Sequence, residues 1–186
     1  ILGTIAQINA FALGAQMTNP RAKVYLEWST LKEQDIEKRI DEIDPNCISG
    51  KDIIVPDDNN HFYGVYHRES GGGEQKNLAM PLCHWGKFYE ELIRTIMAGN
   101  WEQDNDVEKA INYWWGMPTG VVDVICSKKL PAGTVRLVNV LKHNYKTGQF
   151  HTFTDQMYAQ GHILKEKKGE TLSPEEVIEM GWQRIL

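Results

Sequence analysis

Short β-prone segments alternate with amphipathic helical segments along this sequence, and this alternation most limits the folds open to it. Apolar residues recur at helical spacing over residues 5–17, 31–43, 87–98 and 131–147, and β-prone runs lie at residues 23–28, 47–49, 62–66, 78–82 and 121–126. Strands that alternate with helices are typical of a parallel sheet covered on both faces. The pattern therefore predicts a three-layer α/β/α fold around a parallel sheet.

The composition fits one globular unit. Of the 186 residues, 41% are hydrophobic and 24% are charged, so the chain has enough apolar surface to bury a core. This length lies in the usual range for one domain. We therefore expect residues 1–186 to form a single α/β ligand-binding unit.

Several function classes find no support in the residues. The net charge is -5 and the basic residues are scattered, so we expect no nucleic-acid partner. The three cysteines and six histidines lack the spacing of a metal site, and no nucleophile–base pair or phosphate-binding glycine motif is present. No run approaches the roughly 20 apolar residues of a membrane span. We therefore expect no metal, no cofactor and no catalytic residue, and the chain is not expected to be an enzyme.

Aromatic and polar residues gather where the expected strands end. Ligands of open parallel sheets bind outside the carboxyl ends of the strands, where aromatic rings can stack on a flat molecule and polar groups can orient it. The candidates for ligand contact are Trp28, Asp52, Tyr66, His84, Trp85, Trp114 and Trp115.

These candidates also have structural interpretations. Trp28 and Trp85 could pack in a core, Asp52 could cap a helix, and His84 could cap a helix or face solvent. Neighbouring residues on a strand point to opposite faces, so one residue of the pair 114–115 is expected to lie in the core.

Four segments of the chain carry a resemblance to a known family. They read AFALGAQMTNPRAKVYLEWS, with Gly14-Ala15 and Asn19-Pro20, then DIIVPDDNNHFYGVY, LAMPLCHWGKFYEELIRTIMAGNW and INYWWGMPTGVVDV. In this order they resemble the basic membrane lipoprotein family, and most closely the C-terminal part of its members. The resemblance covers nearly the whole chain. It implies a lobe of the type I periplasmic-binding-protein fold, without most of the N-terminal lobe.

The resemblance also implies a function and a location. Members of the family bind purine nucleosides and present them to the permease of an ABC transporter. The implied location is the extracellular face of the cell membrane or the periplasm, and the lipid anchor that holds such proteins is absent from this chain. Tyr66 stands where members commonly have an aspartate, and Cys83 stands where they have a lysine. These two departures leave the ligand class open.

Three functions are compared at this stage. The first is an extracellular solute-binding protein of an ABC importer, with a small molecule held in an aromatic-lined cleft between two lobes. The second is a ligand-sensing domain of a regulator or receptor on the same fold. The third is a hydrolase that uses Cys83 or a histidine. We also expect the chain to self-associate, since the absence of an upstream lobe would expose apolar surface.

Overall fold

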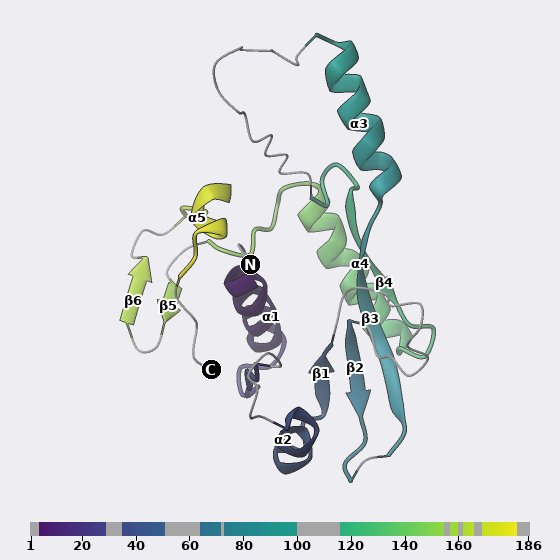
Figure 1. Ribbon diagram of the computed structural model, residues 1–186, viewed down its shortest axis with the longest axis vertical. Helices are drawn as coiled ribbons and strands as arrows, with labels where there is room; N and C mark the ends of the chain where they lie inside the picture. Colours follow the sequence, from purple (N-terminus) through teal and green to yellow (C-terminus); the bar gives the residue numbers. More distant parts are fainter. Residues whose placement is uncertain are drawn as a thin grey trace. The chain divides into compact units, whose positions relative to one another are not determined.

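Helices and strands are mixed in the computed structural model, which describes residues 4–28, 35–50, 64–71, 73–99, 116–154, 157–159, 162–165 and 169–181. The chain divides into two compact units. The smaller unit combines Ile1–Thr30 with Phe150–Leu186, and the larger unit is Leu31–Gln149. The mixed α/β class that the sequence predicts is confirmed (Figure 1).

A four-stranded sheet forms the centre of the larger unit. Its strands lie in the order in which they occur in the chain: β1 (Cys47–Ser49), β2 (Val65–Arg68), β3 (Gln75–Cys83) and β4 (Val122–Cys126). All three pairings are antiparallel, and a bulge interrupts the register of β2 and β3 between Val65 and Tyr66. The prediction of a parallel sheet is therefore wrong for these strands.

The connection between β2 and β3 explains the antiparallel direction. Only residues 69–74 separate the two strands, whereas parallel strands need a crossover of a dozen or more residues. Gly71 supports the turn with a φ of 78°, and the Nζ atom of Lys76 lies 2.9 Å from Glu69 Oε1. The segment of residues 69–74 is thus the turn of a hairpin.

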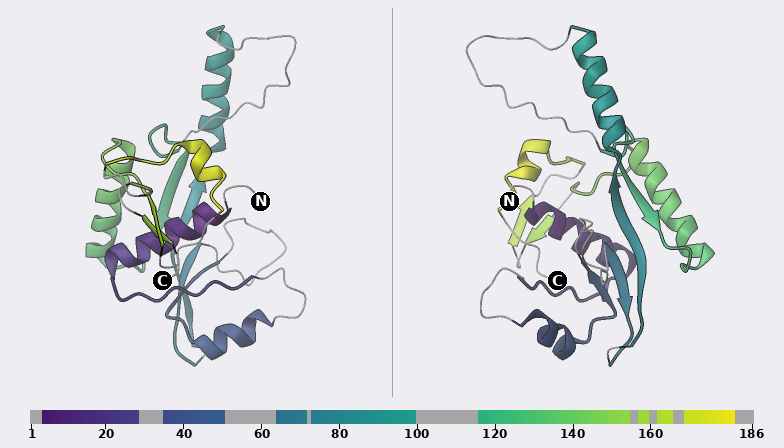
Figure 2. Two further views of the ribbon diagram at one scale, coloured as in Figure 1. Left: turned by 90° about the vertical axis from the view of Figure 1, so that its left-hand side faces the viewer. Right: turned by 45° about the vertical axis from the view of Figure 1, so that its right-hand side comes forward.

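The larger unit also contains three helices. They are α2 (Ile36–Ile43), α3 (Trp85–Met97) and α4 (Ala132–Lys146). Helix α4 runs beside β4 (Figure 2), and Lys142 Nζ donates to the backbone oxygen of Val124 at 2.9 Å. Only His84 lies between the end of β3 and the start of α3. No residue of these three helices is buried.

The smaller unit has its own core. Its elements are α1 (Thr4–Thr18), α5 (Pro174–Ile178) and the antiparallel pair β5 (Met157–Ala159) and β6 (His162–Lys165). The buried hydrophobic cluster consists of Ala6, Phe153, Met157 and Met180. The fully buried Asn9 donates from Nδ2 to the sulfur of Met180 at 3.1 Å. Among the described helices, none is long and apolar enough to cross a membrane.

Candidate functional site

The junction of β3 and α3 holds two of the predicted contact residues, His84 and Trp85. The backbone N–H of His84 donates to the oxygen of Val121 at 2.7 Å, so the end of β3 is fixed against the start of β4. His84 is the N-cap residue of α3 but its side chain makes no capping hydrogen bond. The Trp85 side chain is 60% exposed, and its ring meets Phe88 edge-on with ring centres 5.9 Å apart. The indole is therefore accessible to a ligand, and His84 is half-buried beside it.

Lys87 belongs to the same junction and was not singled out from the sequence. An ideal Cβ atom at Gly120 would lie 2.9 Å from Lys87 Nζ, so the amine lies over this glycine. Gly120 has a φ of 73° and ends the turn formed by residues 117–120. The Lys87 amine forms no ion pair or hydrogen bond with a described residue, while its backbone N–H donates to the oxygen of His84 at 3.0 Å. The approach joins two segments 33 positions apart, which no local pattern predicts.

Tyr66 lies elsewhere on the sheet. It pairs with Ile48 and Asn77, whereas His84 follows Cys83 at the end of β3. Asn77 and Cys83 are six residue steps apart along the extended strand, a length of about 20 Å at about 3.4 Å per step. Burial raises the pKa of the Tyr66 hydroxyl, and the nearby Arg68 opposes that rise. Tyr66 and the pair 84–85 are therefore not brought into one patch.

The structure does not bring the remaining candidate residues together. Trp28 ends a described segment of the smaller unit, and its side chain is 41% exposed. Residues 22–28, predicted to contain a strand, form no strand. Asp52, Trp114 and Trp115 lie outside the described residues. Their contact with a ligand stays a prediction, as it does for the other four candidates.

The acidic groups near the junction are engaged within the protein. Asp123 on β4 accepts a hydrogen bond from Lys142 Nζ at 2.6 Å, and Lys146 Nζ lies 3.9 Å away. The hydrogen bond from Lys142 is the main cause that holds the pKa of Asp123 below its usual value. This carboxylate therefore fastens α4 to β4 and is not a free acceptor for a ligand.

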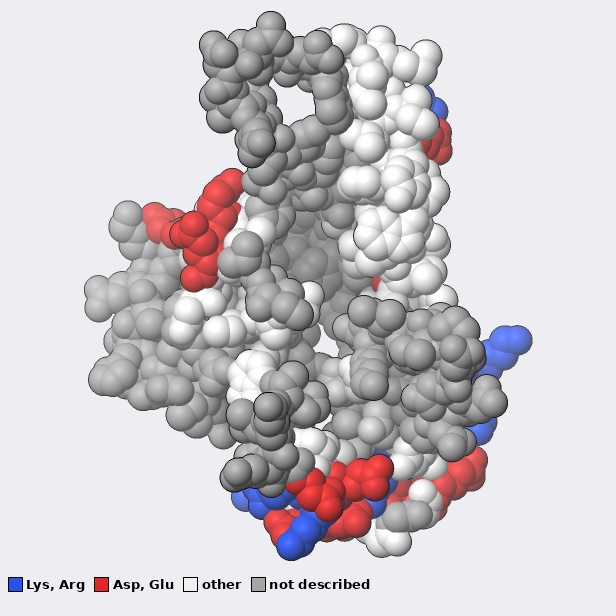
Figure 3. All heavy atoms as spheres, viewed as in Figure 1, with Lys and Arg blue, Asp and Glu red and all other residues white. Residues whose placement is uncertain are grey.

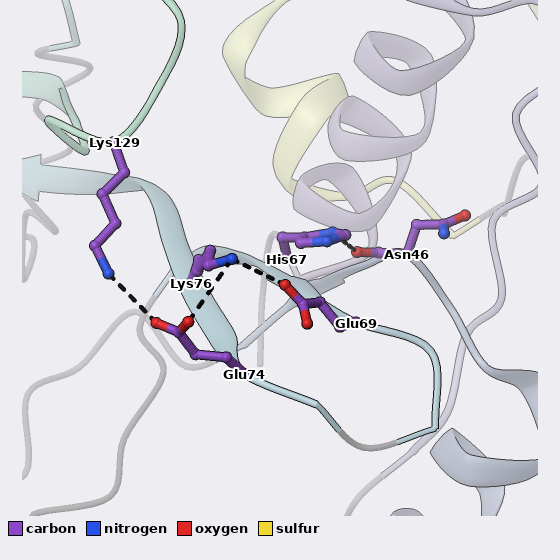
Figure 4. A network of polar contacts seen from close by, with 6 residues as sticks. All are labelled: Asn46, His67, Glu69, Glu74, Lys76 and Lys129. Carbon is purple, nitrogen blue, oxygen red and sulfur yellow. Dashed lines mark hydrogen bonds and ion pairs between the residues drawn. The ribbon is translucent and has the colours of Figure 1, made fainter.

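A polar network along the β2–β3 hairpin is structural as well (Figure 4). Lys76 lies between Glu69 and Glu74, with Nζ 2.9 Å and 3.8 Å from their carboxylates. The hydrogen bond from Lys76 lowers the pKa of Glu69, and the same contact raises the pKa of Lys76. His67 Nδ1 lies 2.7 Å from the backbone oxygen of Asn46. These contacts link the strands to each other. We therefore assign no ligand site to this network.

No metal-binding group emerges from the part of the chain that the structure describes. A search of its histidine, cysteine and acidic side chains finds no cluster of three or more that could hold an ion.

An open groove runs along α3 and is lined by Gly86, Tyr89, Glu90, Ile93, Arg94, Met97 and Ala98. A single helix cannot enclose a small molecule on most of its surface, as ligand pockets do. The junction at His84 and Trp85 remains the best candidate for ligand contact.

Comparison with known proteins points to solute-binding proteins. No family model matches the chain. The chain is 25% identical over 186 aligned residues to a purine-binding protein of Brucella abortus. This alignment covers 94% of the chain and 51% of that protein. It is 30% identical over 129 residues to TsgA13 of Haloferax volcanii, provisionally described as an ABC transporter glucose-binding protein. That match covers 63% of this chain and 31% of TsgA13. The chain thus spans about half of the first relative and about a third of the second.

These relatives support a coarse conclusion. Both are described as binding proteins and neither as an enzyme, which agrees with the expectation that this chain is not an enzyme. Their printed ligands differ, so the similarity supports a solute-binding role without naming the solute. It does not single out the basic membrane lipoprotein family.

Proposed function

We propose that this chain is part of an extracellular solute-binding protein of an ABC importer, of the basic membrane lipoprotein type, with a type I periplasmic-binding-protein fold. The observation that carries the proposal is the similarity to the purine-binding protein over 94% of the chain. The permease of the importer is the implied partner. The proposed location is the outer face of the cell membrane, through a lipid anchor, or the periplasm.

The junction of β3 and α3 supplies the proposed contacts with the ligand. The exposed Trp85 ring offers an aromatic face for stacking, a geometry worth about 0.5–1.5 kcal/mol beyond area burial. His84 and Lys87 add hydrogen-bonding groups next to that ring. Such a site binds and releases a molecule and needs no reacting group, so hinge closure over the ligand is the whole mechanism.

The remaining sequence candidates complete the proposal. Trp28, Asp52, Tyr66, Trp114 and Trp115 are proposed as further contacts, contributed from other segments when two lobes close. Tyr66 lies about 20 Å along the sheet from the junction, which is farther than a purine nucleoside extends, so Tyr66 is proposed as a contact in place of Trp85 and not together with it. A purine base or nucleoside is the proposed ligand, since its ring system suits an aromatic surface.

A thermal-shift titration tests this function. The 186-residue chain is heated with adenine, adenosine, guanosine, hypoxanthine or glucose, and a compound that binds the folded state raises the melting temperature. We expect a purine to raise it, and Trp85→Ala to remove that shift. Tyr25→Ala is the matched control, because Tyr25 is an aromatic residue of similar exposure, 59%, in the other unit. The proposal fails if no compound shifts the chain, or if Trp85→Ala responds as fully as the control.

A further inference from the structure

Strand β4 lies at one end of the four-stranded sheet, and among the described strands only β3 pairs with it. An edge strand presents N–H and C=O groups that can pair with a strand of another molecule. The sequence of β4 suits such pairing, because residues 121–126 read VVDVIC and Asp123 is the only charged residue among them. A strand of this composition needs a feature that blocks its outer edge.

The register of β3 and β4 identifies the backbone groups that face this outer edge. The N–H of His84 donates to the oxygen of Val121 at 2.7 Å. In an antiparallel strand, hydrogen bonds to one neighbour recur at every second residue. The residues that bond to β3 are therefore 121, 123 and 125, and those that face the outer edge are 122, 124 and 126. Pro81, which has no N–H to donate, lies opposite Val124, as this assignment requires.

Both outward groups of Val124, at the centre of β4, are occupied by side chains of the same chain. Its N–H donates to Asp123 Oδ1 at 2.8 Å, and its C=O accepts a hydrogen bond from Lys142 Nζ at 2.9 Å. Lys142 Nζ also lies 2.6 Å from Asp123 Oδ1, so an ion pair holds the two side chains in place. Nearer the start of the strand, the N–H of Val122 donates to the oxygen of Gly116 at 3.4 Å. The centre of the outer edge is thus closed by the chain itself.

The Lys142–Asp123 pair differs from the ion pairs at the surface of the same unit. Acidic and basic atoms lie side by side over α2 in Figure 3, where Arg39 and Glu42 form an ion pair with side chains 46% and 47% exposed. Exposed pairs of that kind stabilise a fold only weakly. Lys142 and Asp123 are 21% and 25% exposed, and they bond to backbone atoms as well as to each other. Their contacts with the backbone give them a role that the surface pair lacks.

We propose that Lys142 and Asp123 block the outer edge of β4 against strand addition, and that the strand they keep out is β4 of a second copy. In an antiparallel pairing centred on Val124, this residue of each copy would donate to and accept from its counterpart. These are the two groups that Asp123 and Lys142 occupy in the single chain. The same edge serves both copies, so the pairing closes at a dimer. This inference is independent of the proposed solute-binding function.

Sedimentation velocity over a concentration series tests the block. Lys142→Met frees the C=O of Val124, and Asp123→Ala frees its N–H. Each variant is expected to self-associate roughly tenfold more strongly than the wild type, the effect of two added backbone hydrogen bonds of ordinary net strength. Lys146→Met is the matched control, because it removes the same charge from the same helix. The Lys146 amine lies 3.9 Å from Asp123 and, among the described residues, bonds to no backbone atom of β4, so this variant should sediment as the wild type does.

A second substitution separates edge pairing from unfolding. Val124→Pro removes an N–H that the pairing with β3 does not use, and proline is tolerated on the outer side of an edge strand. In the Lys142→Met background it is expected to return self-association to the wild-type level, whereas association caused by unfolding would persist or grow. The proposal is overturned if Lys142→Met and Asp123→Ala sediment as the wild type does, if Lys146→Met associates as strongly as they do, or if Val124→Pro fails to reverse the association.

Discussion

The two units of the chain use their helices in opposite ways. In the smaller unit α1 buries Ala6, Asn9 and Ala12, and the cluster around Phe153 and Met180 packs against it. In the larger unit α3 has a clear apolar side yet buries no residue. A separation of apolar and polar faces therefore shows that a helix needs a covering surface, and it does not show where that surface comes from.

The sheet of the larger unit shows the same contrast. Val121 is its one buried hydrophobic residue among those that the structure describes, at the turn before β4. Ion pairs and hydrogen bonds, such as Lys142 with Asp123, join its elements instead. We therefore expect the larger unit to respond weakly to deletions of apolar side chains and strongly to changes of its backbone.

A deletion in the core of the smaller unit is expected to have the largest effect. Phe153 is 7% exposed, and Phe153→Ala removes a buried ring and leaves a cavity, a change that costs about 3–5 kcal/mol. Ile93→Ala on the exposed face of α3 is the paired measurement, with an expected loss below about 1 kcal/mol. Urea unfolding followed by circular dichroism measures both. Equal losses would show that the face of α3 is as well covered as the core of the smaller unit.

A backbone change in the larger unit comes next. Gly64 precedes β2 with a φ of 61°, and a Cβ atom there would overlap the carbonyl oxygen of Ala79 and lie 2.7 Å from the Cα of Met80. Gly64→Ala therefore adds a steric overlap to the strain of positive φ, and we expect a loss of at least about 2 kcal/mol.

The matched control for that change is Gly71→Ala at the hairpin turn. Gly71 has a φ of 78° but open space around it, so it isolates the cost of the backbone angle, about 1–2 kcal/mol. Urea midpoints of the two variants give the comparison. If Gly64→Ala were no more costly than Gly71→Ala, the close packing of this segment against β3 would be refuted.

Local patterns in the sequence predict the helices well. The predicted helices at residues 5–17 and 131–147 match α1 and α4, and at the start of α5 Ser173 and Glu176 form the reciprocal bonds of a capping box. These features depend on contacts within a few residues, which a sequence displays directly.

The direction of the strands could not be predicted in this way. Alternation of strands and helices suggested a parallel sheet, but pairing depends on partners far apart in the chain and on the length of each connection. The same limit hid the β5–β6 pair and led to a strand being assigned at residues 23–28 that does not form.

The candidate site shows a similar division. The sequence placed His84 and Trp85 between a strand and a helix, and the structure places them there. It could not reveal that Lys87 reaches Gly120, or that Tyr66 lies far along the sheet, because both follow from the pairing of β2, β3 and β4. The sequence shows the type and the local position of each candidate residue. It does not show the distances between them.

The smallest expected effect concerns the carboxylate that fastens α4 to β4. The hydrogen bond from Lys142 lowers the pKa of Asp123 in the folded protein below its usual value of 3.8. A lowered pKa in the folded state stabilises the fold fully above the unfolded pKa, and this contribution is lost as the pH falls through the folded value. The stability advantage of the wild type over Asp123→Asn should therefore stay constant above about pH 5 and shrink below about pH 4. Urea unfolding between pH 7 and pH 2.5 measures it, and a repeat in the Lys142→Met background should reduce the dependence to the smaller part that Lys146 and the Val124 N–H contribute. If the advantage persisted unchanged to the lowest pH, polar contacts would not be what joins the larger unit, and the contrast with the apolar core of the smaller unit would weaken.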